Sequence, residues 1–498
     1  RTPNLDRLAA EGVKFSNCFA SYILCTPSRA SYLTGRYTYI TGNGERAHDG
    51  VTVELREDDI IFPQYLKTSG YHTRHVGKSH VGTSTFIDVF TENNTPWDRW
   101  SPPWYDDEEY LAFLRARGLS TYRFARSIYG SPPDGKGKGN FYGGWIEDDQ
   151  GNPFPKEATY PFFLVEKALA AVESKPAHSG PLYLQLDFFG PHQPFAIPGG
   201  MEEREKELRE MLQPPSSYAA AKADNYDDSK EARVYRMYRK NWGMDDPAVM
   251  EDYMVCNALQ FDLLDEALGM LFTGLEKKNL FDRSWIFCIA DHGEMNGESA
   301  LIDKGVYLHP KTLRVPFYVK PPGAGFLRGR TVDAPVALLD IAPTVYEISG
   351  IETAERLDGV SLLPLLLGGE TAAGEGSKDG PGAFFTNRRQ EKPILFEAGS
   401  HVVPNPCVGL YICPDGENEY IFTYNMTDDH DELYHLNTPH EYVNVIREKE
   451  YQQVLADILV RFDEVLSSDA RWFGYSQCFQ LEYARFLEAP SEDRQMFL

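Results

Sequence analysis

The segment around Cys25 combines a thiol with the features of a helix start. Residues 25–36 read CTPSRASYLTGR. Pro27 suits the first turn of a helix, so the Cys25 sulfur is predicted to face a helix N-terminus, where free backbone N–H groups and the helix dipole favour anions. Arg29 adds a positive charge one turn further on. This environment would hold an oxyanion or lower the pKa of a thiol, whereas an arbitrary cysteine at a helix start is more often a buried packing residue.

Other polar side chains follow apolar runs, where the chain is predicted to leave a strand. They are Lys78 and His80 in GKSHVG, His192 in FFGPHQPF, Asp291 and His292 in IADHGE, and Lys304 and His309 in LIDKGVYLHP. In open α/β sheets, ligands bind where loops leave the carboxyl ends of the strands. Taken singly, such a lysine is usually a solvated charge and such a histidine is usually structural. Asp291 and His292 together suit a divalent cation, although a strand-end cap is the simpler alternative.

The composition indicates a globular protein with an acidic surface. The chain has 498 residues, a formal net charge of -25 and seven cysteines. The charge argues against a nucleic-acid partner or an anionic membrane surface. The odd, sparse cysteines exclude a dense disulfide framework, and at most Cys407 and Cys413 are close enough in sequence to pair locally. The sequence contains no apolar run long enough to span a membrane.

The elements that position these residues alternate between strands and helices. Helices are expected over residues 2–12, 248–280, 333–350 and 450–468, and strands over residues 71–77, 180–189, 284–290, 314–320, 394–399, 408–413 and 420–425. Residues 199–232 are predicted to form a charged, exposed helix and loop. The chain is expected to divide into a catalytic domain (1–367), a linker or long loop (368–392) and a C-terminal α+β subdomain (393–498).

The string at Cys25 resembles the C-x-P-S-R-x-x-x-L-T-G-R signature of the type I, formylglycine-dependent sulfatases. Other segments resemble further landmarks of this family in the same order: TPNLDRLAAEGVKFSN, GYHTRHVGKSHVG, ADHGEMNG, DIAPTVYEISGI with LDGVSLLPLLLG, and DELYHLNTPHEYVNV. The resemblance implies an alkaline phosphatase-like α/β/α sandwich with a smaller C-terminal α+β domain. It also implies that a maturation enzyme oxidises Cys25 to formylglycine, whose hydrated aldehyde is the nucleophile in hydrolysis of sulfate monoesters.

The resemblance assigns a role to each basic residue of the predicted site. Lys78 and Lys304 would contact the sulfate, and Arg29 would steady the hydrated aldehyde. His192 would protonate the leaving group, while His80 would hydrogen-bond the second hydroxyl of the aldehyde and assist its collapse. These residue types suit the reaction, which needs a nucleophile, charge compensation for the sulfuryl oxygens and a proton for the alcohol. His309 follows Lys304 closely enough to be a candidate substrate contact.

The implied metal site combines Asp291 and His292 with the formylglycine at position 25. The family adds two aspartates from a first strand, which would precede residue 1 of this chain, so we expect that strand to be missing. The cation is usually calcium, but a histidine ligand admits manganese or zinc more readily. The sequence indicates no cellular compartment; members of this family are often periplasmic, secreted or lysosomal.

Two competing functions and the identity of the substrate stay open. A phosphonate or phosphate ester hydrolase on the same scaffold shares the signature, and a catalytically silent binding protein would keep Cys25 unmodified and bind no metal. A sulfated carbohydrate is favoured over a small aryl or alkyl sulfate. The aromatic residues within 93–110 and 142–149 would form a surface that stacks on sugars, or they would simply pack.

Overall fold

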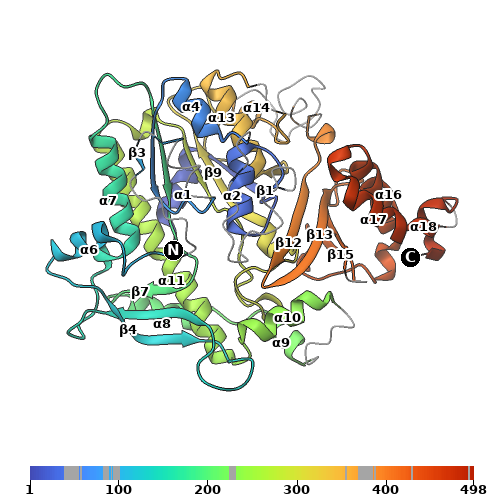
Figure 1. Ribbon diagram of the computed structural model, residues 1–498, viewed down its shortest axis with the longest axis horizontal. Coiled ribbons are helices and arrows are strands. Elements are labelled where there is room, and N and C mark those ends of the chain that lie inside the picture. Colours follow the sequence, from blue (N-terminus) through green and yellow to red (C-terminus); the bar gives the residue numbers. More distant parts are fainter. Residues whose placement is uncertain are drawn as a thin grey trace.

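The computed structural model describes residues 1–38, 55, 59–81, 89, 90, 92, 93, 101–223, 231–353, 356–367, 385, 388–427, 430–491 and 494–497. Figure 1 shows strands flanked by helices in the left and centre of the view, and a second group of strands and helices around the C-terminus on the right. The α/β class with a C-terminal α+β unit is therefore confirmed. Within the described ranges, no helix is both long and apolar enough to cross a membrane.

The largest of the described sheets has five strands in the order β10-β1-β9-β8, with β11 also paired to β1. Its members are β1 (Val13–Phe19), β8 (Ile286–Ile289), β9 (Arg314–Lys320), β10 (Arg330–Val332) and β11 (Val336–Ala337). Strand β9 runs antiparallel to both β1 and β8. Phe15 lies opposite Phe317 across the β1–β9 pair, and their rings stack with centroids 5.0 Å apart. The strands expected around residues 284–290 and 314–320 are confirmed.

A second sheet contains three parallel strands in the order β3-β2-β6. These are β2 (His72–Gly77), β3 (Glu92–Asn93) and β6 (Leu182–Asp187). No described strand joins the two sheets, so β6 and β8 are both edge strands. Most of their residues are half-buried, although apolar strands of an α/β sheet are normally covered on both faces. The strand expected to precede residue 1 stays a prediction.

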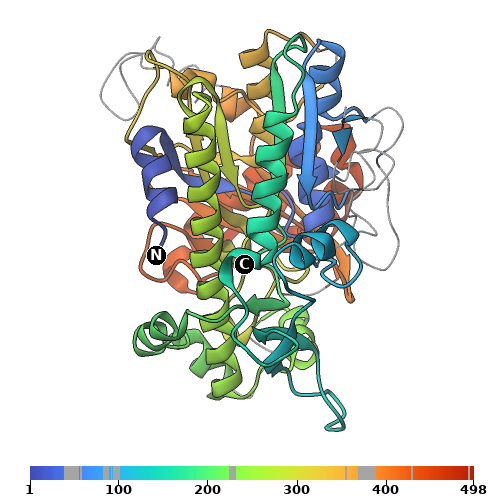
Figure 2. The same cartoon turned by 90° about the vertical axis from the view of Figure 1, so that its left-hand side faces the viewer.

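Helices cover the strands on two sides. On one side, α7 (Tyr160–Glu173) and α11 (Pro247–Lys277) pack against each other, and Figure 2 shows them side by side in front of the strands. On the other side, α2 (Cys25–Thr34), α4 (Phe62–Thr68) and α13 (Ile341–Ser349) are in mutual contact. The other described helices of this part are α1 (Pro3–Glu11), α6 (Glu108–Arg115), α8 (Glu202–Met211), α9 (Ser216–Ala223), α10 (Arg233–Trp242), α12 (Pro310–Leu313) and α14 (Leu363–Leu366). This is the expected α/β/α arrangement.

A small sheet lies next to the loop that carries His192. It has the order β4-β5-β7, where β4 (Arg123–Tyr129) and β5 (Phe141–Glu147) form an antiparallel hairpin and β7 (Phe195–Ile197) pairs parallel to β5. Because β7 begins three residues after His192, this hairpin supports the end of that loop. The charged segment expected at 199–232 contains α8 and α9 and leads into α10.

The C-terminal unit is an antiparallel sheet in the order β12-β13-β14-β15, covered by helices. Its elements are β12 (Leu395–His401), β13 (Val403–Ile412), β14 (Tyr420–Asn425), β15 (Glu432–His435), α16 (Gln452–Ser467), α17 (Phe473–Glu482) and α18 (Ala484–Glu488). Phe396 packs against Phe19 of β1, with ring centroids 5.7 Å apart, and Glu397 accepts a hydrogen bond from the Thr38 amide. The two units thus share one hydrophobic core. Most of the linker expected at 368–392 lies outside the described residues, and the domain boundaries stay predictions.

Cys407 and Cys413, which are close enough in sequence to pair locally, do not form a disulfide, because both are free thiols. Cys407 is buried within β13, and Cys413 directly follows this strand. Six residues of extended chain separate two Cα atoms by about 20 Å, whereas a disulfide requires a separation below about 7 Å. Proximity in sequence is therefore misleading when the intervening residues form a strand.

Candidate active site

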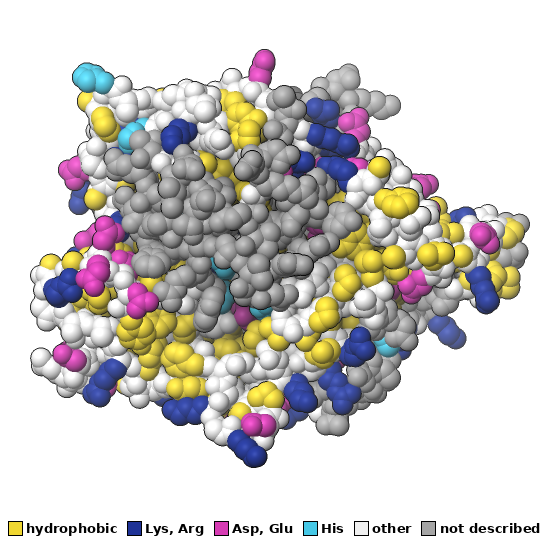
Figure 3. All heavy atoms as spheres, in the orientation of Figure 1, with side chains coloured by type: hydrophobic (Ala, Val, Ile, Leu, Met, Phe, Trp, Pro, Cys, Tyr) yellow, Lys and Arg dark blue, Asp and Glu magenta, His cyan; other side chains and the backbone are white. Residues whose placement is uncertain are grey.

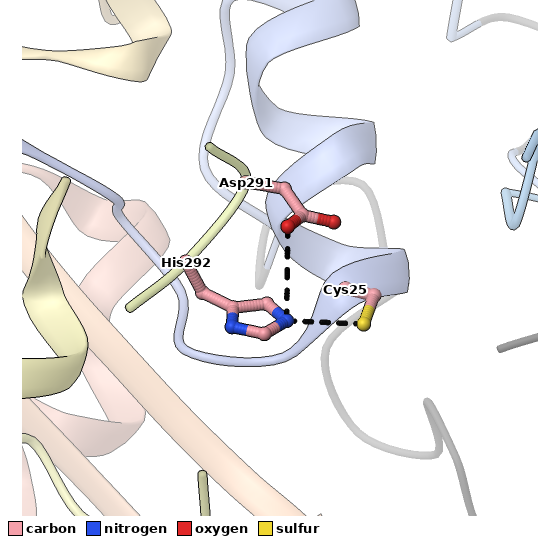
Figure 4. A group of neighbouring side chains, drawn as sticks. All are labelled: Cys25, Asp291 and His292. Atoms are coloured by element: carbon pink, nitrogen blue, oxygen red, sulfur yellow. Dashed lines mark hydrogen bonds and ion pairs between the residues drawn. The ribbon is translucent and has the colours of Figure 1, made fainter. Parts of the chain in front are cut away.

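Cys25 begins helix α2, so its sulfur lies at a helix N-terminus, as the sequence predicts. Leu24 precedes it in an extended conformation, and no side chain caps the helix. Cys25 is buried, and its Sγ atom lies 3.1 Å from His292 Nε2 and 3.4 Å from Lys78 Nζ. Figure 4 shows the thiol projecting from the first turn of α2 toward the imidazole of His292, which follows β8. Three segments that are distant in sequence therefore meet at this sulfur.

The charges around Cys25 stabilise an anion. Burial by itself raises the pKa of the Cys25 thiol, but Lys304, Lys78 and His292 outweigh this effect and hold the pKa well below its ordinary value. A cationic, water-poor environment of this kind stabilises any negatively charged atom at the position of the sulfur, including an oxyanion.

Arg29 is buried one turn after Cys25 and is held between two carboxylates. Its Nε atom lies 2.9 Å from Asp291 Oδ2, and its Nη1 atom lies 3.2 Å from Asp187 Oδ1. The same Nη1 group donates a hydrogen bond to the backbone carbonyl of Lys78 at 3.0 Å. Arg29 belongs to α2, and its partners come from the loops after β2 and β8 and from the end of β6, so Arg29 connects four parts of the site.

Cys25, Asp291 and His292 could hold a metal ion, since one ligand atom from each lies within 4.8 Å of the others. The His292 Nδ1 atom lies 2.8 Å from the Gly293 carbonyl oxygen. A carbonyl only accepts, so Nδ1 carries the proton and Nε2 faces the group as a potential ligand. Burial raises the pKa of Asp291, but His292 and Arg29 hold it well below its usual range. The donor set of a carboxylate, an imidazole and the group at position 25 fits a divalent cation.

Lys304 and His192 form a second pair of site residues that acts on Cys25. Lys304 is buried, and its Nζ atom lies 2.6 Å from His192 Nε2. The His192 Nδ1 atom lies 2.6 Å from the Gln193 carbonyl oxygen. The carbonyl only accepts and the ammonium only donates, so Nδ1 carries the single ring proton and Nε2 is unprotonated. Burial and the charge of Lys304 lower the pKa of His192, which agrees with a neutral ring.

Lys78 and His80 follow the end of β2, where Gly77 lies very close to the backbone of β6. Gly77 has a φ of +104°, and a Cβ atom there would lie 1.9 Å from the backbone oxygen of Asp187. Only glycine allows β2 and β6 to approach this closely. Lys78 is consequently buried beside Cys25. His80 follows with a φ of +53° and is half-buried.

His309 is buried, and the described contacts of its side chain are with Lys311 and with tyrosines of the C-terminal unit. Its Nδ1 atom accepts a hydrogen bond from the Lys311 amide, and its Nε2 atom lies 3.3 Å from the Tyr442 carbonyl. The ring also packs against Tyr442 and Tyr434. Because both nitrogens already contact the protein, a substrate contact by His309 would require one of these hydrogen bonds to break, and that contact stays a prediction.

Two further polar residues of the site were not predicted from the sequence. Asp187 accepts from Arg29 and His75, and Asp303 contacts Lys304 and Gln193. Asp187 ends the apolar run LYLQLD, and Asp303 directly precedes Lys304. The sequence therefore shows a carboxylate at each position, one at the end of a predicted strand and one beside a predicted site residue, but it does not show which residues these carboxylates contact.

The expected aromatic surface is largely buried. Trp104 and Tyr110 are 7% and 0% exposed, and Tyr142 is 2% exposed. Trp145 is covered by the guanidinium of Arg126, which lies 3.2 Å from its ring centroid. Residues 94–100 lie outside the described ranges. Within the part that is described, these aromatic residues mainly pack, and only Tyr105, at 56%, is widely exposed.

Comparison with known proteins places this geometry in a family. A family model named Sulfatase matches residues 1–351. The chain belongs to the sulfatase family. Among curated proteins, the chain is 26% identical over 372 residues to "Uncharacterized sulfatase YidJ" of Escherichia coli, covering 73% of this chain and 65% of the relative. It is 24% identical over 400 residues to N-acetylglucosamine-6-O-sulfatase of Bacteroides thetaiotaomicron, covering 74% and 66% of the two chains.

Solved structures show the same fold at low sequence identity. One is a protein in complex with its substrate, D-glucosamine-2-N,6-O-disulfate, with 19% identity, a TM-score of 0.64, and coverage of 95% of this chain and 93% of the other. Another is the phosphonate monoester hydrolase of Agrobacterium radiobacter, with 20% identity, a TM-score of 0.65, and coverage of 95% and 91%. The alkaline phosphatase-like fold is therefore confirmed, and it is shared by proteins with different names and substrates.

Proposed function

We propose that this member of the family hydrolyses sulfate monoesters after conversion of Cys25 to formylglycine by a maturation enzyme. The observation that carries the proposal is the environment of the Cys25 sulfur, a helix N-terminus surrounded by Lys78, Lys304, His292 and His192. Such an environment matches the charge that develops on the oxygens of a sulfuryl group during transfer. In addition, Cys25 stands in the segment that resembles the conversion signature.

The aldehyde expected at position 25 and the expected divalent cation would supply one part of the chemistry. Asp291 and His292 would hold a divalent cation beside position 25, where a hydrated aldehyde would supply the attacking hydroxyl. Calcium is the first candidate because the carboxylate is a hard oxygen ligand, and manganese is the second because His292 contributes nitrogen.

The cationic residues of the chain bind and orient the ester. Lys78 and Lys304, both buried, face the position of the Cys25 sulfur and would pair with the non-bridging sulfate oxygens. Arg29 keeps Asp291 in place through the 2.9 Å contact. His80, two residues after Lys78, is proposed to hydrogen-bond the second hydroxyl of the aldehyde. The substrate sulfate would thus replace interactions that these cations now make with protein groups.

His192 is proposed to protonate the departing alcohol. In the absence of substrate, its Nε2 atom is unprotonated and accepts a hydrogen bond from Lys304. A bound sulfate gives the Lys304 ammonium an anionic partner and places negative charge beside the imidazole, which raises the pKa of His192. Nε2 then takes up a proton and can pass it to the leaving oxygen as the ester bond breaks. The overall reaction consumes one water and releases an alcohol and sulfate.

A small sulfated carbohydrate is the proposed substrate. Relatives named for action on sulfated sugars, such as the N-acetylglucosamine-6-O-sulfatase, support this class. Among the described side chains of the face in Figure 3, lysines and arginines lie in several separate places rather than along one groove. The net charge of -25 also disfavours a long polyanion. A short sulfated sugar that meets the buried cations at Cys25 avoids this repulsion.

The first experiment tests conversion of Cys25 by mass spectrometry. The protein is expressed with a formylglycine-generating enzyme, and the tryptic peptide from Phe15 to Arg29 is analysed. An aldehyde at Cys25 followed by release of sulfate from an aryl sulfate supports the proposal. An intact thiol, in a strain that converts a control sulfatase, contradicts it and favours a silent binding protein. Faster release from a matched phosphate or phosphonate ester would instead identify a phosphonate or phosphate ester hydrolase.

A further inference from the structure

We infer that Asp303 is a positioning residue for proton transfer to the leaving group, acting through Lys304 and Gln193; this inference rests on the proposed function. Asp303 is 4% exposed. Its Oδ1 atom lies 2.7 Å from Lys304 Nζ, and its Oδ2 atom accepts a hydrogen bond from Gln193 Nε2 at 2.8 Å. One carboxylate therefore holds both the Lys304 ammonium and the side chain of Gln193, the residue next to His192.

These contacts close a ring around His192. Lys304 Nζ lies 2.6 Å from His192 Nε2, and His192 Nδ1 donates to the Gln193 carbonyl at 2.6 Å. The ring thus runs from Asp303 to Lys304, to His192, to Gln193 and back to Asp303. The hydrogen bonds described between these two segments, which are more than a hundred residues apart, are made by side chains, so the carboxylate helps to set the position of the ammonium relative to the imidazole.

Gln193 depends on Asp303 for its orientation. Its side chain is 7% exposed, and its Oε1 atom has no hydrogen-bond partner among the described residues. The contact with Asp303 is made by its Nε2 group. A buried side-chain amide whose oxygen accepts no hydrogen bond lowers the stability of the fold. A role in holding the loop that carries His192 would explain why a buried glutamine is present at this position.

The backbone of Asp303 dictates the substitution that tests its carboxylate. Asp303 has a φ of +56°, a conformation that asparagine and aspartate adopt more readily than other residues with a side chain. Asp303→Asn therefore removes the negative charge with little change in shape or backbone strain. Asp282→Asn is the matched control, because Asp282 is a mostly exposed carboxylate 4.0 Å from a different lysine, Lys320.

The kinetic test compares two sulfate esters with different leaving groups in converted protein. Asp303→Asn should lower kcat for an unactivated alkyl or sugar sulfate by about 100-fold, in the range of a lost general acid, and for 4-nitrophenyl sulfate by about 10-fold or less. In a His192→Ala background the same substitution should lower both rates by one common factor, because the group through which it acts is gone. Asp282→Asn should change neither rate.

A second measurement needs neither conversion nor metal. In unconverted protein with ¹⁵N-labelled histidine, the Nε2 resonance of His192, assigned by its loss in His192→Ala, should move in Asp303→Asn and in Gln193→Ala but not in Asp282→Asn. If the wild type releases no sulfate, the proposed function fails, and the NMR comparison still decides the positioning role. Equal losses on both esters in Asp303→Asn, or an unmoved His192 resonance in the folded variant, would overturn the inference.

Discussion

Replacing Asp187 with asparagine should weaken both the fold and the site, because this carboxylate holds a buried guanidinium. Asp187 Oδ1 lies 3.2 Å from Arg29 Nη1, and its Oδ2 atom lies 3.0 Å from His75 Nε2 and 2.7 Å from Gln185 Nε2. Asparagine keeps the size of the side chain but removes its charge and one acceptor. The substitution therefore leaves Arg29 with a neutral neighbour in place of an ionised one.

The expected loss follows from the remaining partners of Arg29. Breaking a buried ion pair by removing one partner costs about 3 to 5 kcal/mol. Arg29 keeps Asp291 at 2.9 Å and the Lys78 carbonyl at 3.0 Å, so the lower limit of about 3 kcal/mol applies. At roughly 1 °C per kcal/mol for a chain of 498 residues that shares one core, Tm should fall by about 3 °C. Turnover of an aryl sulfate should fall as well, because Arg29 positions Asp291.

The effect should depend on pH in a defined direction. Burial raises the pKa of Asp187, but Arg29 and His75 outweigh it, so the folded-state pKa lies below the ordinary value. A carboxylate with a lowered pKa stabilises the fold above the unfolded-state pKa of about 4, and this contribution is lost as the pH falls toward the folded-state pKa. The difference in Tm between wild type and Asp187→Asn should be largest near neutral pH and should shrink in acid.

Thermal unfolding at several pH values measures this difference, with Asp282→Asn as the control for loss of a carboxylate outside the site. The reasoning is refuted if Asp187→Asn unfolds within about 1 °C of the wild type at neutral pH, where a cost of about 3 kcal/mol predicts a fall of about 3 °C. A gap that stays constant into acid would show that the carboxylate charge is not the cause.

Three other substitutions test separate parts of the site. Cys25→Ala should abolish sulfate release from an aryl sulfate, and Cys25→Ser should do so where the maturation enzyme accepts only cysteine; substantial activity of the alanine variant would contradict the formylglycine mechanism. His192→Ala should reduce kcat by about 100-fold or more for poor leaving groups and much less for 4-nitrophenyl sulfate, and equal losses would exclude the acid role. Gly77→Ala should lower Tm and activity together, since its Cβ would meet the Asp187 oxygen at 1.9 Å; a normal Tm would contradict the close approach of β2 to β6.

The expected strands and helices agree with the structure where one local pattern dominates. The apolar runs before His192 and Asp291 became β6 and β8, and the spacing of apolar residues after Pro247 became α11. The pairing of strands could not be predicted in this way, because hydrogen bonds join β1 to β9 across about 300 residues. The division of the described strands into two sheets, and the support of the His192 loop by the β4–β5 hairpin, are likewise long-range features.

The sequence by itself predicted which groups would do the proposed chemistry, because Cys25, Lys78, His192 and the Asp291–His292 pair lie in short segments that resemble the motifs of one family. Only the tertiary structure decided which carboxylates accompany the cations, since Asp187 and Asp303 acquire their partners through contacts between distant segments. It also decided that His309 and most of the aromatic residues are packed inside. Residue type sets what a side chain can do, whereas burial and distance set its charge and its partners, and neither of these is a local property of the chain.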